Sequence, residues 1–284
     1  MKLLWSSDLH FDWIVSGPDD RSAIDELAET WSDAADGIVI TGDISTGGYV
    51  ASDILRFQEV YGKPVYFVLG NHDYYYSSFD IVQKQLSSTP VHLNYLQNKP
   101  CVIGDTTIVG VDGWYDGLSG VINDFRMTDF RVIHEFAEGS GSCPETFDDI
   151  GDYWLWLSRK KARQSANLLA AQLASVTTPN VLVATHVPPF PELCRYNGQP
   201  SEPEYLPFYT NTTLGFLLDG FASKNPDKKI MVLSGHTHSE YCFYKRENLI
   251  SYVAEAEYGS PQIHALIDLE SMKIDISEAI VLGD

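Results

Sequence analysis

Residues 65–73 read VYFVLGNHD, an apolar run that stops abruptly at polar residues. Five consecutive apolar residues rich in β-branched and aromatic side chains are typical of a strand buried on both faces. Gly70 ends the run, and Asn71, His72 and Asp73 carry groups that bind metals or transfer protons. This stretch predicts a buried strand that delivers functional side chains at its end.

Four further apolar runs end in the same way. They lie at 3–5, 37–40, 181–184 and 230–233, and the residues shortly after them include Asp8, His10, Asp43, His186, His236 and His238. Helix-like stretches at 20–35, 50–61 and 158–175 alternate with these runs, which is typical of an α/β fold with a largely parallel sheet. The carboxyl ends of parallel strands share one edge, so we expect these side chains to converge there.

The rest of the chain is organised differently. Short strand-like segments at 241–244, 249–256, 262–269 and 273–282 predict antiparallel strands that complete a second sheet against the first. Segment 112–157 holds several tryptophans and tyrosines among glycine, aspartate and serine, and we expect it to form an ordered lid or cap. No repeat or linker appears, so residues 1–284 are predicted to form a single domain with this insertion.

Composition narrows the possible partners. The 284 residues include 19 Lys and Arg against 39 Asp and Glu, a formal net charge of −20. A broad electrostatic grip on long nucleic acid or on an anionic membrane needs basic surface, so both partners are disfavoured. A small anionic substrate bound at one site is not excluded. The hydrophobic content of 44% rules out a disordered acidic chain.

The sequence carries few features that indicate a cellular compartment. Residues 1–8 turn polar too early for a signal peptide, and no apolar run approaches the roughly 20 residues that span a bilayer. The four cysteines are scattered, which indicates neither a disulfide framework nor a zinc site. We expect a cytoplasmic protein.

The polar residues at the strand ends have the chemistry of a metal centre. Taken singly, each short motif is as easily a turn or a surface accident. Taken together they supply two carboxylates, one amide and four imidazoles, a set that suits manganese, iron or zinc, and also cobalt or nickel. Seven ligands are too many for one tetrahedral ion but fit two ions about 3.5–4 Å apart that share a carboxylate, the arrangement used for phosphoryl hydrolysis.

In this order the motifs resemble the five blocks of the calcineurin-like metallophosphoesterase superfamily. The blocks are Asp8-Leu9-His10, Gly42-Asp43, Gly70-Asn71-His72-Asp73, Thr185-His186 and Gly235-His236-Thr237-His238. The resemblance implies a four-layer αββα sandwich of two mixed β-sheets flanked by helices. It also implies that Asp8, His10 and His238 hold one ion, that Asn71, His186 and His236 hold the other, and that Asp43 bridges both. His72 matches the catalytic histidine of the superfamily.

One position departs from the pattern. Many members carry Asp or Asn three residues after the bridging aspartate, where it supports the catalytic histidine, and this chain has Thr46 there. A hydroxyl can hydrogen-bond an imidazole but stabilises its protonated form less than a carboxylate does. Asp73 is the candidate to supply the missing charge.

The resemblance predicts a metal-dependent phosphoesterase, either a phosphatase or a phosphodiesterase. A hydroxide bridging the two ions would attack a small phosphomonoester or phosphodiester, Asn71 would help to neutralise the phosphate, and His72 would assist the leaving oxygen. Arg126, Arg131 and Tyr74 are the candidate substrate-binding residues. Two alternatives remain at this point: a catalytically weak or inactive scaffold that binds a protein partner, and a metal-dependent hydrolase acting on amides.

Overall fold

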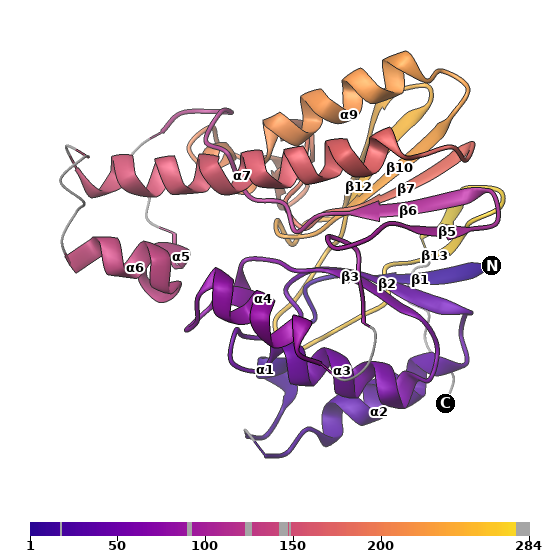
Figure 1. Ribbon diagram of the computed structural model, residues 1–284, viewed down its shortest axis with the longest axis horizontal. Helices are drawn as coiled ribbons and strands as arrows, with labels where there is room; N and C mark the ends of the chain where they lie inside the picture. The colour runs from indigo at the N-terminus through magenta and orange to yellow at the C-terminus, as the bar shows by residue number, and fades with distance from the viewer. Residues whose placement is uncertain (18, 90–92, 123–126, 142–146, 148, 277–284) are drawn as a thin grey trace.

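Two six-stranded β-sheets stack face to face between two layers of helices (Figure 1). The computed structural model describes residues 1–17, 19–89, 93–122, 127–141, 147 and 149–276. Helices α7 and α9 cover one outer face and α2 and α3 cover the other. The predicted four-layer αββα sandwich is therefore confirmed.

The first sheet has the strand order β14-β13-β1-β2-β3-β4. Its strands are β1 (Lys2–Ser6), β2 (Gly37–Thr41), β3 (Val65–Val68), β4 (Asn94–Tyr95), β13 (Ala265–Asp268) and β14 (Lys273–Asp275). Strands β1 to β4 run parallel, and β13 pairs antiparallel with β1. The helices on this side of the molecule are α1 (Phe11–Ile14), α2 (Ser22–Ser32), α3 (Val50–Tyr61) and α4 (Phe79–Ser87).

The second sheet has the strand order β11-β12-β10-β7-β6-β5. Its strands are β5 (Cys101–Ile103), β6 (Thr106–Gly110), β7 (Asn180–Ala184), β10 (Lys229–Ser234), β11 (Tyr241–Arg246) and β12 (Leu249–Val253). The remaining helices are α5 (Asp129–Val132), α6 (His134–Gly141), α7 (Ile150–Ala174), α8 (Leu206–Tyr209) and α9 (Thr212–Lys224). A hairpin of β8 (Arg195–Tyr196) and β9 (Gln199–Pro200) and two short 3-10 turns, His72–Tyr74 and Pro191–Leu193, complete the described chain.

The layering explains why the strands read as unbroken apolar runs. In β1, Leu4 packs in the core beneath the helices, whereas Leu3 and Trp5 pack in the core between the sheets. In the second sheet, Leu182 faces the core between the sheets, and Val181 faces a third core that contains residues of α7 and α9. Because both faces of each central strand are covered, alternation between polar and apolar residues is absent.

Two sequence-based predictions need correction. The C-terminal strands do not all complete the second sheet, because β13 and β14 join the first sheet beside β1. The long helix predicted at 158–175 begins at Ile150, where the Asp149 side chain accepts a hydrogen bond from the Asp152 backbone and caps the helix. The C-terminal limit of the predicted insertion at about 112–157 therefore lies within α7.

The described part of segment 112–157 packs against the rest of the molecule and contributes side chains to its core. Helices α5 and α6 lie beside the N-terminal half of α7, at the end of the sandwich opposite the N-terminus (Figure 1). Trp114, Phe130, Phe136 and Trp154 are buried in the same core as residues of α2 and α3. The role of this segment as a lid remains a prediction. None of the described helices is both long and apolar enough to cross a membrane.

Candidate metal centre

The polar residues at the five strand ends meet at one place, although their strands belong to two sheets. Asp8 and His10 follow β1, Asp43 follows β2, and Asn71 and His72 follow β3 in the first sheet. His186 follows β7, and His236 and His238 follow β10 in the second. The convergence that the sequence predicted along one sheet edge is thus made by the adjacent edges of two stacked sheets.

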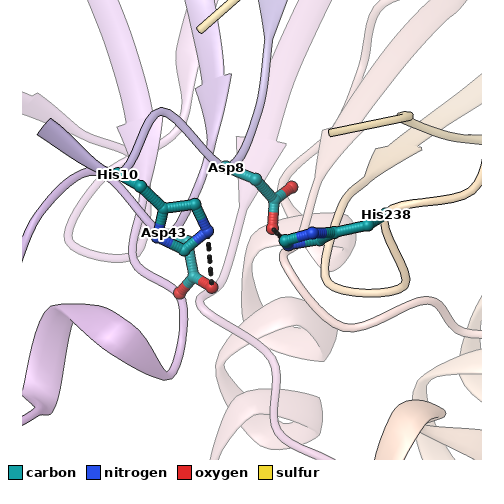
Figure 2. A group of neighbouring side chains, drawn as sticks. All are labelled: Asp8, His10, Asp43 and His238. Atoms are coloured by element: carbon teal, nitrogen blue, oxygen red, sulfur yellow. Dashed lines mark ion pairs between the residues drawn. The ribbon is translucent and has the colours of Figure 1, made fainter. Parts of the chain in front are cut away.

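One group of ligands comprises Asp8, His10, Asp43 and His238, whose candidate ligand atoms all lie within 4.8 Å of one another. His238 Nε2 is 3.1 Å from Asp8 Oδ1, and His10 Nε2 is 3.9 Å from Asp43 Oδ2. Figure 2 shows the four side chains pointing toward a common space. Two carboxylates and two imidazoles at this spacing form a site for a divalent transition metal.

A second group lies on the other side of Asp43. His186 Nε2 is 3.1 Å from Asn71 Oδ1 and 3.4 Å from Asp43 Oδ2. The ring centroid of His236 lies 5.0 Å from that of His186. Asp43 Oδ2 therefore faces imidazoles of both groups, which is the position of a bridging carboxylate.

Outer hydrogen bonds orient two of the imidazoles. His186 Nδ1 lies 2.9 Å from the carbonyl oxygen of Thr41, and His236 Nε2 lies 3.0 Å from the carbonyl oxygen of Phe208. A ring nitrogen that donates to a carbonyl leaves its opposite nitrogen with a lone pair for a metal, and such partners also fix the ring plane. With a cation bound, this arrangement would leave Nε2 of His186 and Nδ1 of His236 to hold it.

Asp129 is a residue of the candidate site that sequence reasoning missed. Its Oδ1 accepts hydrogen bonds from Asn71 Nδ2 at 3.0 Å and from the Tyr75 hydroxyl at 2.7 Å, and its Oδ2 accepts one from Tyr115 at 2.9 Å. This contact turns the Asn71 amide oxygen toward His186. Asp129 lies within segment 112–157 and belongs to no motif, so only its negative charge among aromatic residues could have drawn attention to it.

The residues fit a bound cation. Both ring nitrogens of His10 are buried, and neither has a hydrogen-bond partner in the described part of the chain. Buried polar atoms without a partner are rare in native proteins because each carries a desolvation cost. Burial lowers the pKa of His10 to about 4, so at neutral pH the ring is neutral and has a lone pair to offer a metal.

The two aspartates keep their charge despite burial. Desolvation raises the pKa of Asp8, but His238 beside it more than compensates, and the pKa lies below its usual range. Desolvation likewise raises the pKa of Asp43, but His186 and His72 lower it by more, so this pKa lies well below its usual range. For His186, the Asp43 carboxylate overcomes desolvation and raises the pKa to about 10. Without a metal, Asp43 and His186 therefore form a buried ion pair.

The loops that carry the ligands are strained. Asp8, His10, Asp43, His236 and His238 all have positive φ angles, of 53°, 43°, 50°, 71° and 52°. A non-glycine residue in this left-handed region costs on the order of 1–3 kcal/mol and persists only where its surroundings enforce it. Strain concentrated on five ligand residues is typical of a functional site.

His72 stands at the edge of the metal centre. Its ring stacks on Tyr75 with centroids 4.1 Å apart, and its Nε2 lies 3.5 Å from the Tyr258 hydroxyl and 4.0 Å from Asp43 Oδ2. Among the residues that the structure describes, Thr46 forms no hydrogen bond with His72; its carbonyl accepts from the backbone of the following helix. The hydroxyl that contacts the His72 ring is thus that of Tyr258 and not that of Thr46.

Asp73 occupies a bracing position in the structure. One carboxylate oxygen accepts hydrogen bonds from the backbone of Ile44 and Ser45, and the other accepts one from Gly70. These bonds tie the loop after β2 to the loop after β3. The geometry therefore favours a positioning role for Asp73 over the catalytic one predicted from sequence.

A cleft of about 810 Å³ opens over the metal centre. Its lining includes residues of the β8–β9 hairpin and five residues of the candidate metal centre: Asp43, Asn71, His72, His236 and His238. The structure does not bring Tyr74 to it, because that side chain is 3% exposed and its hydroxyl donates to Asp112. Arg131 is exposed and is not among the lining residues, and Arg126 lies outside the described residues.

Comparison with known proteins agrees with this geometry. A family model described as calcineurin-like phosphoesterase matches residues 1–240. A dimetal phosphatase from Danio rerio has a TM-score of 0.56 and 16% sequence identity, over 95% of this chain and 92% of that chain. The phosphopantetheinyl hydrolase of Mycobacterium tuberculosis has a TM-score of 0.53 and 15% identity, over 91% and 90%. These two likenesses concern the fold. No curated protein sequence matches the chain.

Proposed function

Because the chain belongs to the calcineurin-like phosphoesterase family and is a metal-dependent phosphoesterase, we propose that it hydrolyses a small phosphomonoester or phosphodiester at two divalent ions. Asp8, His10 and His238 would hold the first ion, Asn71, His186 and His236 would hold the second, and Asp43 would contribute its carboxylate to both. Manganese, iron or zinc suits this donor set. A cytoplasmic location, a preference for small esters over long nucleic acid, and a capping role for segment 112–157 belong to the same proposal.

One observation carries the assignment. His10 is fully buried with no partner for either ring nitrogen among the described residues, and it faces two ionised aspartates and His238. A side chain in this state lowers the stability of the fold unless a cation occupies the space in front of it. This cost favours a protein that binds a metal over a scaffold that has lost its metal centre.

The chain contributes specific steps to hydrolysis. When bound, two divalent ions supply the Lewis acidity that activates water and offsets the charge of the phosphate. His72 donates a proton or hydrogen bond to the leaving oxygen from the edge of the cleft, a contribution of about 10²–10⁴-fold where such catalysis operates. Stacking on Tyr75 holds the His72 ring in place for this transfer.

Asn71 and Asp43 are held in fixed orientations by hydrogen bonds. The Asn71 amide nitrogen is engaged by Asp129, so its oxygen is the atom presented to the second ligand group. Asp43 Oδ1 accepts a hydrogen bond from the His72 backbone at 2.8 Å, while Oδ2 faces the imidazoles. One aspartate thus couples the bridging position to the loop that carries the proton donor.

The test is the variant Asp43→Asn, which keeps the shape of the side chain and removes its charge. We expect both ions to be lost and the turnover of nitrophenyl phosphate and bis-nitrophenyl phosphate with Mn(II) to fall at least about 1000-fold, because the bridging charge is missing. Elemental analysis and initial rates measure the two effects. Asp219→Asn, in α9 and paired with Arg246, is the matched control and should retain both ions and activity.

The outcomes separate the alternatives. Comparing the two nitrophenyl esters shows whether the monoester or the diester is preferred. Near-normal activity in Asp43→Asn would overturn the proposal. Failure of the unmodified protein to bind metal or to hydrolyse either ester would favour the scaffold alternative.

A further inference from the structure

The cleft is much larger than a phosphoryl group. Its volume of about 810 Å³ is in the range of pockets that enclose a drug-sized organic molecule. The metal-centre residues occupy only its floor. The remaining space is therefore available to the leaving group of the substrate, and the residues around it decide which leaving group fits.

Aromatic rings stand on both sides of the metal centre. The Tyr258 ring lies 4.4 Å from that of His10 and 5.1 Å from that of His238, and Trp13 packs 4.9 Å from its centroid. On the side of the second ligand group, Tyr209 lies 4.9 Å from His236, and Tyr205 lies 6.2 Å from Tyr209. The backing rings hold Tyr258 and Tyr209 in fixed orientations.

These rings are accessible to a ligand. Tyr205 and Tyr258 are each 43% exposed, and both line the cleft together with Tyr75, Tyr196 and Tyr209. Aromatic surface left uncovered in a concave site is typical of a binding surface. Tyrosine rings recognise planar groups by stacking, and their hydroxyls remain hydrated at the rim.

Charge contributes little to this part of the cleft. Among the described lining residues, Arg195 is the only Lys or Arg. Its guanidinium lies 3.6 Å from the Tyr241 ring centroid, and its Nη1 donates to the Gly198 carbonyl, so it stabilises the hairpin. Glu202 adds a negative charge to the same wall. Beyond the metal centre, the described lining combines five tyrosines with mostly neutral polar side chains, and Arg195 is its single Lys or Arg.

We infer that the cleft selects phosphate esters whose leaving group carries a neutral, planar aromatic ring system, which stacks on Tyr258 or on Tyr205 and Tyr209. The inference rests on the proposed function and names its substrate class. Nucleosides and simple aryl-alkyl alcohols share this chemistry, and the experiment distinguishes them. An aliphatic leaving group such as glycerol gains nothing from the rings.

The experiment compares kcat/KM of the Mn-loaded protein for adenosine 5′-monophosphate, phenethyl phosphate and glycerol 3-phosphate. All three release a primary alcohol, so their intrinsic reactivities are similar and differences report contacts with the leaving group. We expect at least one aromatic ester to exceed glycerol phosphate about tenfold or more. Preference for the nucleotide identifies a nucleoside, and preference for phenethyl phosphate identifies a simple aryl group.

Variants locate the effect in the rings. Tyr205→Ala should lower kcat/KM for the preferred aromatic ester about tenfold and leave glycerol phosphate within about twofold, whereas Tyr205→Phe should retain the preference. Tyr244→Ala, a 69% exposed tyrosine of β11 outside the cleft lining, is the control and should change neither. Tyr196→Ala, on the exposed hairpin, provides a second test should Tyr205→Ala fold poorly.

A readout that does not depend on turnover completes the design. Saturation-transfer NMR with adenosine and phenethyl alcohol on the metal-free protein should show transfer to the aromatic protons of the preferred alcohol, and Tyr205→Ala should weaken it. Equal kcat/KM for all three esters, or equal losses for aromatic and aliphatic esters in Tyr205→Ala, would overturn the inference while nitrophenyl phosphate turnover persists. Loss of turnover on these three esters and on both nitrophenyl phosphate and bis-nitrophenyl phosphate would instead overturn the proposed function.

Discussion

Asn71 is placed by a network that reaches well beyond the metal centre. Its amide nitrogen donates to Asp129, which also accepts hydrogen bonds from Tyr75 and Tyr115. All four groups are buried, and the Asp129 carboxylate accepts a hydrogen bond from each of the three donors. The position of one ligand of the second ion is thus set by a residue about 60 positions later in the chain.

We predict that Asp129→Asn lowers the affinity for the second ion and the activity about 10- to 100-fold, the usual effect of removing a partner that orients a metal ligand. The new amide nitrogen cannot accept the hydrogen bond from Tyr115 or Tyr75, so the Asn71 amide loses its fixed orientation. A manganese titration followed by initial rates measures both effects. Asp116→Asn, which alters a buried acid bonded to Thr213, should leave the second ion in place. Unchanged metal affinity in Asp129→Asn would contradict the assigned role.

Some residues of the candidate site could be predicted from short sequence motifs, and others reach it only through tertiary contacts. The seven metal-ligand candidates follow short motifs at strand ends and could be predicted from sequence, and the structure brings them together. Asp129 and Tyr258 belong to no motif, because each reaches the site only through folding of a distant segment. Tyr74 illustrates the converse error: it directly follows a motif, but the turn directs its hydroxyl to Asp112.

At the scale of elements, the turns between strand and loop are the decisive features. Gly70 ends β3 where the backbone passes close to the bridging aspartate. A Cβ atom added there would lie 2.6 Å from Asp43 N and 2.7 Å from His186 Nε2, and closer still to Asp43 Oδ1. Only glycine allows the loop that carries Asn71 and His72 to approach the loop after β2 this closely.

We predict that Gly70→Ala displaces Asp43 and lowers both metal content and activity by at least about 100-fold, since a shift of about 1 Å at a reacting site has effects of this size. Metal analysis and initial rates measure the outcome. Gly220→Ala in α9 is the matched control, because a Cβ there meets nothing within 4 Å. It should retain activity and gain up to about 1 kcal/mol in the free energy of unfolding, because alanine favours a helix. Full activity in Gly70→Ala would show that the loops can separate without loss of the site.

The helices and strands could be predicted where neighbouring residues in the sequence determine them. The five buried strands carry continuous apolar runs, and α3 matches its predicted range of 50–61. Strand pairing is not local, however. Nothing in the sequence of β13 and β14 distinguishes pairing beside β1 from pairing in the second sheet, and register is settled by packing across the whole sandwich. The missed start of α7 depended on a single capping side chain, Asp149.

At the scale of the whole molecule, the metal centre joins the two sheets. The first sheet supplies Asp8, His10, Asp43 and Asn71, and the second supplies His186, His236 and His238. The core between the sheets is apolar and contains Leu3, Leu182 and other residues of both sheets. The candidate metal ligands are carboxylates, an amide and imidazoles. Bound cations would therefore act as cross-links between two halves that are otherwise held by apolar packing and by the buried pair of Asp43 and His186.

Metal removal should accordingly destabilise the whole fold. Each ion that binds only the native state, present at 100 times its dissociation constant, adds about 2.7 kcal/mol to the free energy of unfolding. For a chain of this size, two ions together correspond to a rise in Tm of at least about 5–10 °C. We predict that a chelator lowers Tm by this amount, that Mn(II) restores it, and that Asp43→Asn shows neither change. Differential scanning fluorimetry measures the shift, and hydrogen exchange should show lost protection in the ligand loops of both sheets together. Loss of protection confined to one sheet would mean that the ions are held by that sheet alone and do not link the two.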